Sequence, residues 1–344
     1  MKHATRFPLL TRRQLLAGAL ATAALPSFAR VPGWATVVDA ARSLPQCHAL
    51  MVLQDGQEVA QEVFRGPALA RPVPIKSVSK SVVSALTGAA IDRGELPGVD
   101  ARLGEIAPQL IPDTADPRVA DITIEDLVTL QAGLERTSGP NYGGWIGSSN
   151  WVADALSRPM VAVPGARMLY STGTTHVLGA VLAEVSGQSL LSLARTRLGA
   201  PLAIDIPAWT RDPQGRYLGG NEMALTLDAM ARFGEMYRLQ GAWQGQQVLS
   251  ADWVNHSFRA RTRSPWSGLG YGYGWFLGQS GGDAYALARG YGGQIICVAP
   301  SLGLTVALTS DPTRPARSGG YFGDLMRLIE TRVLPAARQA LQET

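Results

Sequence analysis

Strand-like runs at the two ends of the chain, with a long helical region between them, constrain the fold most strongly. Near the start, residues 48–53 form an apolar run and residues 58–64 a roughly alternating one. They are joined across Asp55-Gly56, a strong hairpin signal. A lone hairpin is marginally stable in water, so this one needs partner strands. The sequence predicts one antiparallel sheet that also uses the late runs 270–277, 284–288, 294–299 and 304–309.

Helical spacing dominates the chain between these two sheet halves. The predicted helices are 77–93, 123–130, 151–156, 175–185, 190–198 and 225–239. Glycines follow several of them, as Gly94 and Gly241 do, and glycine favours helix termination. A last helical segment, 321–334, should cover one face of the sheet. We therefore expect an α+β domain at 30–344, with its sheet in 45–76 and 268–344 and an inserted, mostly helical part at 77–267.

The first 29 residues resemble a twin-arginine export signal. Arg12 and Arg13 precede an apolar stretch of small residues at 17–25, and Ser27-Phe28-Ala29 fits a small-x-small cleavage site. The alternative is a transmembrane anchor, but this stretch is far shorter than the roughly 20 residues that a membrane span needs. We therefore expect an exported, periplasmic protein that begins at Arg30 and has no membrane span.

Removal of this segment would change the charge balance of the protein. The full chain has 31 basic and 27 acidic residues and a formal net charge of +4. The first 29 residues hold four of the basic residues and no acid, so the remainder is neutral. No basic patch or stripe is left, and the sequence therefore does not indicate nucleic-acid binding.

Cysteine and histidine do not form a metal-binding pattern in this sequence. The two cysteines, Cys47 and Cys297, are not part of a C-x-x-C motif, and the four histidines form no H-E-x-x-H. Both cysteines lie in strand-like runs, where they either pair in an oxidising compartment or remain small buried hydrophobic residues. We expect no metal site, and nothing implies a cofactor.

Two of the three lysines of this chain lie at the start of the predicted helix 77–93. Lys2 lies in the expected signal, and the other two, Lys76 and Lys80, flank Ser77. Ser77 and Lys80 are spaced S-x-x-K, which places a serine nucleophile one helical turn from a lysine. A desolvated lysine can lose its proton, whereas arginine cannot. The alternatives are a serine that caps the helix and a lysine in solvent.

Several segments together resemble the serine β-lactamase and penicillin-binding-protein superfamily. They appear in the family's order across nearly all of the chain after residue 29, at 77–96, 122–134, 164–172, 177–187, 225–233, 243–245 and 292–294. The most similar type is the class C branch, with its esterases, D-aminopeptidases and 6-aminohexanoate-oligomer hydrolases. This resemblance implies the β-lactamase/transpeptidase-like fold and a serine hydrolase that forms an acyl-enzyme.

The resemblance also implies roles for individual residues. Ser77 would be the acylated nucleophile, and Lys80 its general base or proton partner. Tyr170 falls on the tyrosine of the family's Y-x-N motif and would act as a phenolate or a proton shuttle. The oxyanion hole would combine the backbone N–H groups of Ser77 and Gln294. Whether Lys80 or Tyr170 takes the first proton stays open, because a coupled pair titrates as a unit.

Two departures from the family pattern bear on the substrate. Thr172 replaces the asparagine of Y-x-N, and Tyr291-Gly292-Gly293 stands where K-T-G or H-x-G usually lies. In β-lactamases the missing lysine and asparagine help hold the carboxylate and amide of the substrate, so a neutral ester or amide becomes the expected substrate. Arg289, just before this segment, could still meet a carboxylate or could be an exposed residue at a strand end. Tyr291, Gly293, Thr172 and Arg289 are therefore candidate substrate-binding residues.

Three further features are weighed as parts of a site. Residues 278–282 satisfy G-x-S-x-G, but strands on both sides indicate a hairpin turn and not a nucleophile elbow. His176 could join a Ser-His-Asp triad, or it could cap or pack a helix. The segment 141–151 is rich in glycine and aromatic residues. With Trp145 it could line the substrate cleft or close over it, or its tryptophans could pin it to the core.

The sequence thus predicts an exported serine hydrolase that acts on a small-molecule or peptide-like substrate. It would cleave an ester or amide bond through Ser77, with Lys80 and Tyr170 as general base and acid. One alternative is a protein that reacts with β-lactams or cell-wall peptides, similar to a β-lactamase or a D-Ala-D-Ala carboxypeptidase. Another is a binding or sensing module of the same fold that does not turn over.

Overall fold

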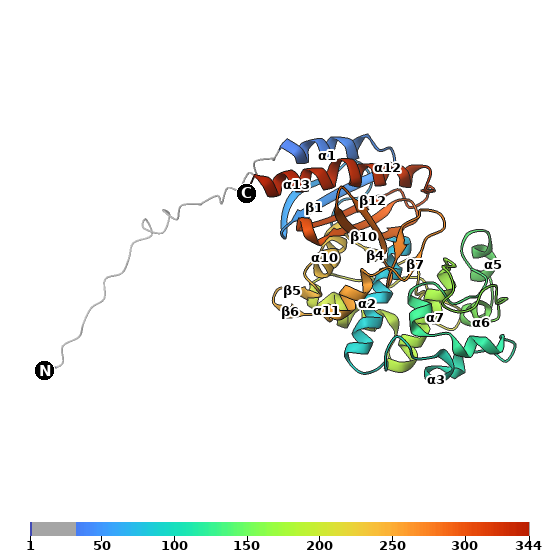
Figure 1. Ribbon diagram of the computed structural model, residues 1–344. Helices are drawn as coiled ribbons and strands as arrows, with labels where there is room; N and C mark the ends of the chain where they lie inside the picture. The colour runs from blue at the N-terminus through green and yellow to red at the C-terminus, as the bar shows by residue number, and fades with distance from the viewer. Residues whose placement is uncertain (2–31, 344) are drawn as a thin grey trace.

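An antiparallel sheet of eight strands forms one half of the protein in the computed structural model (Figure 1). The structure describes Met1 and residues 32–343, so the predicted export signal and its cleavage site lie outside the described residues, apart from Met1. The strand order is β2-β1-β12-β11-β10-β9-β8-β7. The strands are β1 (Cys47–Gln54), β2 (Gln57–Val63), β7 (Thr262–Arg263), β8 (Gly270–Tyr271), β9 (Phe276–Ser280), β10 (Asp283–Gly290), β11 (Gln294–Ala299) and β12 (Leu304–Ser310).

The two ends of the chain meet in the middle of this sheet. Strand β1 pairs antiparallel with β12, from Cys47 opposite Ser310 to Gln54 opposite Leu304. Strand β12 pairs in turn with β11. The predicted antiparallel sheet, built from early and late segments, is therefore confirmed.

Both faces of the sheet are covered by helices. All six residues of β11 and all seven of β12 are buried. Since successive side chains of a strand point to opposite faces, only a sheet covered on both sides can bury every residue of a strand. This explains why these runs are continuously apolar in the sequence and do not alternate.

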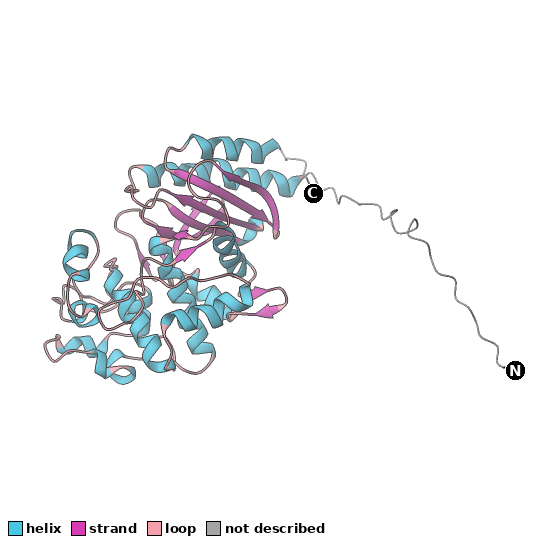
Figure 2. Ribbon diagram, turned by 180° about the vertical axis from the view of Figure 1, so that it is seen from behind, coloured by secondary structure: helices cyan, strands magenta, loops and turns pink. Residues whose placement is uncertain are grey.

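Helices from the two ends of the chain pack on the outer face of the sheet (Figure 2). They are α1 (Pro32–Ser43), α12 (Tyr321–Leu328) and α13 (Leu334–Gln342), the last two joined by a π-helical turn at Ile329–Val333. The helix predicted at 321–334 is present and covers this face. Helix α1 was not predicted, although Trp34, Val37, Val38 and Ala41 have helical spacing and are buried.

The other face of the sheet packs on the inserted helical part. All six predicted helices are present there, with bounds that differ by a few residues. This part holds α2 (Ser79–Asp92), α3 (Leu103–Ile106), α4 (Ile124–Val128), α5 (Tyr142–Ile146), α6 (Trp151–Leu156), α7 (Thr172–Ser186), α8 (Leu190–Ala194), α9 (Ala200–Leu202), α10 (Leu227–Arg238) and α11 (Ala251–Ser257). Short pairs β3 (Val73–Pro74) with β4 (Ala224–Leu225) and β5 (Ala242–Trp243) with β6 (Gln246–Gln247) complete it.

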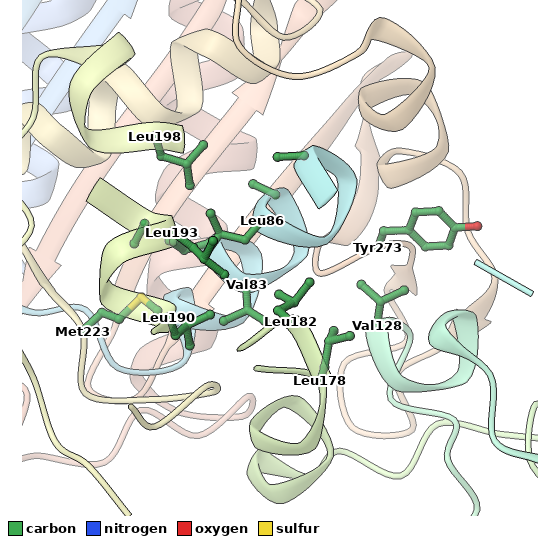
Figure 3. Close-up of a cluster of buried hydrophobic side chains, with 14 of the residues drawn as sticks. Val83, Leu86, Val128, Leu178, Leu182, Leu190, Leu193, Leu198, Met223 and Tyr273 are labelled. Atoms are coloured by element: carbon green, nitrogen blue, oxygen red, sulfur yellow. The ribbon is translucent and has the colours of Figure 1, made fainter. Parts of the chain in front are cut away.

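Helix α2 lies at the centre of the helical part. Its residues from Ser79 to Ala90 are all buried, and Val83 and Leu86 lie among apolar side chains of α7 and α8 (Figure 3). A helix that is apolar all round is a buried helix. Its polar residues are also paired, because the hydroxyl groups of Ser81 and Ser84 donate to the carbonyls of Gly274 and Tyr273. The start of α2 is thus held from several sides.

The structure also describes the G-x-S-x-G segment, the two cysteines and the helices that were considered as membrane spans. The G-x-S-x-G at 278–282 ends β9 and turns into β10, with Ser280 opposite Asp283, as expected for a hairpin. Cys47 and Cys297 are free and buried, and burial raises the pKa of the Cys47 thiol to about 12. Within residues 32–343 no single helix has the length and hydropathy to cross a membrane, although the bent pair Thr172–Ser186 and Leu190–Leu202 passes that test together.

Candidate active site

Ser77 lies in a short 3-10 turn, Lys76–Val78, directly before α2. It does not cap α2, whose first turn has no side-chain cap. Lys76 adopts a positive φ of 52°, in the left-handed region that non-glycine residues rarely occupy. Backbone strain of this kind needs support from the surrounding structure. Here the N–H of Ile75 donates to the carbonyl of Met223 at 2.9 Å, which fixes the chain just before Ser77.

Lys80 is the second residue of α2 and lies one helical turn after Ser77. Its side chain is buried, and its Nζ donates to the carbonyl of Gly220 at 2.6 Å. Nζ is also 3.3 Å from the Ser77 Oγ and 3.4 Å from the Thr172 Oγ1. No carboxylate pairs with Lys80 among the residues that the structure describes. Desolvation therefore acts unopposed and lowers the pKa of Lys80 to about 7.

The ring of Tyr170 lies close to the amine of Lys80. The Lys80 Nζ is 5.0 Å from the centroid of the Tyr170 ring. Burial raises the pKa of Tyr170 above its usual value, although a hydrogen bond with Ser77 and the charge of Arg289 oppose the rise. At neutral pH the phenol therefore keeps its proton, while the lowered pKa of Lys80 makes its neutral form accessible.

Thr172 takes the position of the missing asparagine and still faces Lys80. Its hydroxyl also lies 3.0 Å from the Ser138 Oγ, which in turn accepts a hydrogen bond from the Thr172 backbone N–H at 2.9 Å. Threonine offers one hydroxyl where asparagine offers an amide, so it can meet Lys80 but presents no NH₂ donor to a substrate. The departure from the family motif thus keeps a contact with Lys80.

The carbonyl that accepts from Lys80 belongs to a segment anchored by a buried hydrogen bond between a histidine and a carboxylate. His176 of α7 lies 3.1 Å from the Asp212 carboxylate, and both side chains are fully buried. The Nδ1 of His176 accepts the N–H of Gly219, so its Nε2 carries the proton that Asp212 accepts. Burial alone would raise the pKa of Asp212, but hydrogen bonds from His176 and Arg216 hold it below its usual value. His176 is therefore a packing and positioning residue and forms no triad with Ser77.

A cavity of about 830 Å³ opens above Ser77. Among the predicted site residues, it is lined by Ser77, Tyr170, Thr172, Arg289 and Tyr291. The structure thus brings together residues from the start of α2, the start of α7 and the end of β10. Gly290 can lie there only because it has no side chain, since a Cβ would come within 2.3 Å of the Ile75 carbonyl oxygen.

Three predicted residues do not reach this cavity. Gln294 is fully buried in β11, and its side chain is occupied by the backbone carbonyl and N–H of Ser310. Gly293 lies in the turn before β11 with a φ of 101°, packed against Tyr321. Trp145 is fully buried, with its indole N–H donated to the carbonyl of Trp151 at 2.9 Å. The tryptophans pin the 141–151 segment to the core, so Trp145 itself is not a substrate-contacting residue.

The cavity also contains residues that the sequence analysis missed. Tyr142, from the same 141–151 segment, lines it and accepts a hydrogen bond from Asn221. The Lys76 ammonium pairs with the Glu222 carboxylate at 2.9 Å. Other lining residues include Arg136, Trp266, Phe276, Arg317 and Phe322. They are scattered over nearly 200 positions, and no local motif marks them.

The described residues contain no cluster of three or more His, Cys, Asp or Glu side chains that could hold a metal ion. The cavity itself offers hydroxyl, amine and guanidinium groups. Together, the Ser77 hydroxyl, the Lys80 amine beneath it and the Tyr170 phenol form a possible nucleophile, base and acid.

Comparisons with known proteins agree with the overall fold. A model of the family described as Beta-lactamase matches residues 40–329. A solved structure from Bacillus anthracis, with the provisional name 6-aminohexanoate-dimer hydrolase, has a TM-score of 0.73 at 16% identity and covers 90% of this chain and 82% of that chain. A penicillin-binding protein homologue from Caulobacter crescentus has a TM-score of 0.70 at 16% identity, over 89% and 98%.

A further solved structure widens the range of activities with this fold. EstCE1, a hydrolase with promiscuous acyltransferase activity, has a TM-score of 0.69 at 18% identity and covers 87% of this chain and 96% of that chain. No curated protein sequence matches the chain. At such identities the structural matches show the fold, which is that of β-lactamases and transpeptidases.

Proposed function

This chain belongs to the beta-lactamase family, and from that premise we propose that it is an exported serine hydrolase that cleaves an ester or amide bond. The reaction would pass through an acyl-enzyme on Ser77. One observation carries the proposal: the buried Lys80 amine lies 3.3 Å from the Ser77 Oγ and has a pKa of about 7. Export rests on the sequence of residues 1–29 alone.

Lys80 is the general base in this proposal. A base works best when its pKa lies near the operating pH, because a useful fraction is then unprotonated. Lys80 meets this condition, whereas the raised pKa of Tyr170 keeps its phenol neutral. Neutral Lys80 takes the proton of Ser77 while the serine oxygen attacks the substrate carbonyl. Tyr170 then gives its proton to the leaving group and regains one from Lys80.

The oxyanion hole is assigned to two backbone N–H groups. One is that of Ser77, as in the sequence prediction. For the second, Tyr291 replaces Gln294, because Tyr291 lines the cavity and Gln294 does not. The N–H of Tyr291 makes no hydrogen bond to another described residue, so it is free to hold a developing negative charge.

Deacylation follows the same route in reverse. A water molecule takes the place of the leaving group, and the Lys80–Tyr170 pair removes its proton as it attacks the acyl-enzyme. The products are a free acid and regenerated Ser77. A module that becomes acylated and never turns over would stop before this step.

Intact-protein mass spectrometry tests the proposal directly. The protein would be exposed to p-nitrophenyl acetate and to a penicillin, alongside Ser77→Ala. We expect acetyl transfer or turnover of the ester in the wild type, and neither in the variant. Ser280→Ala is the matched control, since Ser280 belongs to the other serine motif, at the β9–β10 turn.

The outcomes of this experiment separate the candidate functions. Ester turnover that is lost only in Ser77→Ala supports the hydrolase. A stable adduct without turnover would instead favour a binding or sensing module. Equal ester turnover in Ser77→Ala and the wild type would refute the assignment of Ser77 as the nucleophile.

A further inference from the structure

The cavity above Ser77 carries positive charges that no carboxylate among residues 32–343 pairs with. Lys76 is paired with Glu222. The guanidinium groups of Arg136, Arg289 and Arg317 also line the cavity, and none of the three forms an ion pair within residues 32–343. About half of the other arginines of the described chain have such partners, as Arg238 does with Glu235. The concentration of unpaired guanidinium groups at one cavity needs an explanation.

Arg289 is the most confined of these three side chains. Its Cζ lies 3.4 Å from the centroid of the Phe322 ring and 4.8 Å from that of Phe276. It is largely withdrawn from solvent, and its burial lowers the pKa of the guanidinium to about 10. The aromatic faces attract the cation, but they supply no hydrogen-bond acceptor in the plane of its N–H groups. Its side chain makes no hydrogen bond to any described residue.

A carboxylate of the substrate would complete this arrangement. The guanidinium presents a planar fork of donors that matches the two oxygens of a carboxylate. Stripping water from a cation costs free energy unless a partner of opposite charge replaces the water. The rings of Phe276 and Phe322 would hold an apolar chain next to this charge. Arg136 and Arg317 add positive potential that attracts an anion into the cavity.

The Arg289 group is also close to the proposed chemistry. The ring of Phe276, on which it lies, stacks on the ring of Tyr170 with centroids 6.3 Å apart and an interplanar angle of 22°. Tyr170 in turn covers Lys80. One ring therefore separates the guanidinium from the proton-transfer pair, so a single small molecule can contact both.

We propose that the substrate is acidic: an ester or amide that carries a carboxylate, which Arg289 binds between Phe276 and Phe322. This inference rests on the proposed hydrolase function and names the substrate class of the same site. It reverses the expectation of a neutral substrate, which followed from the loss of the family's lysine and asparagine. Those residues are absent, and a guanidinium from another position of the fold supplies the positive charge.

Arg289 could affect catalysis through the pKa of Tyr170 instead of through binding of the substrate, and the experiment must distinguish these two roles. Its charge lowers the pKa of Tyr170 and opposes the effect of burial there. If this were its whole role, a change at Arg289 would affect all substrates alike and would move the pH dependence. Binding of a substrate carboxylate instead predicts a loss that depends on the charge of the substrate.

The experiment compares two matched pairs of esters. The first pair is mono-p-nitrophenyl adipate and its methyl ester, which differ in a carboxylate on the acyl side. The second is 4-acetoxybenzoic acid and its methyl ester, with the carboxylate on the leaving group. We expect the wild type to have a higher kcat/KM for the acid of at least one pair, and the pair identifies the side that Arg289 contacts.

Variants of Arg289 then test the residue itself. Arg289→Gln should lower the acid-to-neutral ratio of kcat/KM by roughly 10- to 100-fold, the size expected for a hydrogen bond to a charged group. Arg289→Lys, which keeps the charge without the fork, should retain part of the ratio. Arg314→Gln is the control, because Arg314 lies in the same loop as Arg317 but does not line the cavity. It removes the same charge and should leave both rates and their ratio unchanged.

A binding measurement makes the test independent of turnover. Adipate binding to Ser77→Ala, followed by calorimetry, should weaken roughly 10- to 100-fold when Arg289→Gln is added. If Arg289→Gln does not fold, Arg289→Met replaces it in this test, because methionine keeps an apolar side chain between the rings of Phe276 and Phe322. Equal loss of both members of a pair, no preference for an acid, or adipate binding that ignores Arg289 would each overturn the inference. Turnover by Ser77→Ala would overturn the hydrolase proposal alone, because the binding test would still stand.

Discussion

Two buried polar side chains, His176 and Lys80, form hydrogen bonds with the segment 217–222. They differ in whether a charged partner is present. On one side, the His176 imidazole has two hydrogen-bond partners, the Asp212 carboxylate and the Gly219 N–H. On the other side, Lys80 is equally buried but meets only neutral oxygens, from Gly220, Ser77 and Thr172. The first group is paired with a charge, and the second is a cation without a counter-ion.

This difference separates a group that stabilises the fold from one that is available for chemistry. Breaking a buried pair leaves an uncompensated charge and is strongly destabilising. A buried amine without a carboxylate partner destabilises its own charged form, and this lowers its pKa into the range useful for proton transfer. The two are connected, since Gly219 is bonded to His176 and the next residue, Gly220, receives the hydrogen bond of Lys80. A side chain at Gly220 would crowd this contact, because a Cβ there would lie 3.1 Å from the Lys80 Nζ.

The largest effect is expected at Lys80. Lys80→Met should lower kcat/KM by about 10²- to 10⁴-fold, because it removes the proposed base. The same change should raise the free energy of unfolding by about 1–4 kcal/mol, since an apolar chain replaces a poorly solvated amine. Ester hydrolysis and urea unfolding measure the two effects. Lys76→Met, which breaks the pair with Glu222, provides the contrast and should not raise stability. A Lys80→Met protein with wild-type turnover would end the proposal that this lysine is the base.

The second largest effect is expected on stability, at the hydrogen-bonded pair of His176 and Asp212. His176→Leu should lower the free energy of unfolding by about 3–5 kcal/mol, because Asp212 is left buried without its partner. Chemical unfolding at pH 7 measures this. The destabilisation should shrink as the pH falls, since the pKa of Asp212 lies below its usual value and its contribution is lost when the carboxylate is protonated. His256→Leu, at an exposed position, is the control, and a loss of equal size there would contradict the pairing argument.

The pH dependence of the reaction should follow Lys80. The base must be neutral to act, so kcat/KM should rise with pH and level off above about pH 7, the pKa of Lys80. Below that value the rise should approach tenfold for each pH unit. Initial rates with an uncharged ester between pH 5 and 9 would measure the profile. A flat profile through pH 7 would show that Lys80 does not control acylation.

The smallest effect is expected at Thr172. Its hydroxyl accepts a hydrogen bond from Lys80 at 3.4 Å and favours the charged amine. Thr172→Val should therefore move the rising limb of the pH profile to lower pH, by up to about one pH unit for a hydrogen bond of about 0.5–1.5 kcal/mol. The profile of the variant, measured with the same ester, gives the shift. A move to higher pH would mean that the hydroxyl stabilises the neutral amine instead.

The sequence specified the local elements and the motif because both depend on short-range patterns. Continuous apolar runs identified β11 and β12, and helical spacing identified α6 with the same bounds as in the structure. The spacing of Ser77 and Lys80 needs only one helical turn. Tyr170 was found through the family resemblance, which also covers the order of the segments.

Long-range contacts could not be obtained in this way. Gln294 was placed by alignment with a motif, but the pairing of β10 with β11 buries it and leaves Tyr291 at the cavity. Trp145 looked suited to a substrate because it lies in a glycine-rich loop, yet Trp151 and His176 surround it. Burial of a single side chain depends on neighbours that are distant in the sequence.

The sequence by itself determined that this chain builds one antiparallel sheet with an inserted helical part, whose first helix begins near a serine and a lysine. Hydrophobic periodicity and spacing are sufficient for that, since they act over a few residues. Only the tertiary structure decided which charges are paired. In the folded chain Lys80 has no carboxylate partner among the described residues, whereas Asp212 is hydrogen-bonded to His176. Arg289 lies between the rings of Phe276 and Phe322. Desolvation and ion pairing depend on every group within a few ångströms, and these groups come together only when the whole chain is folded.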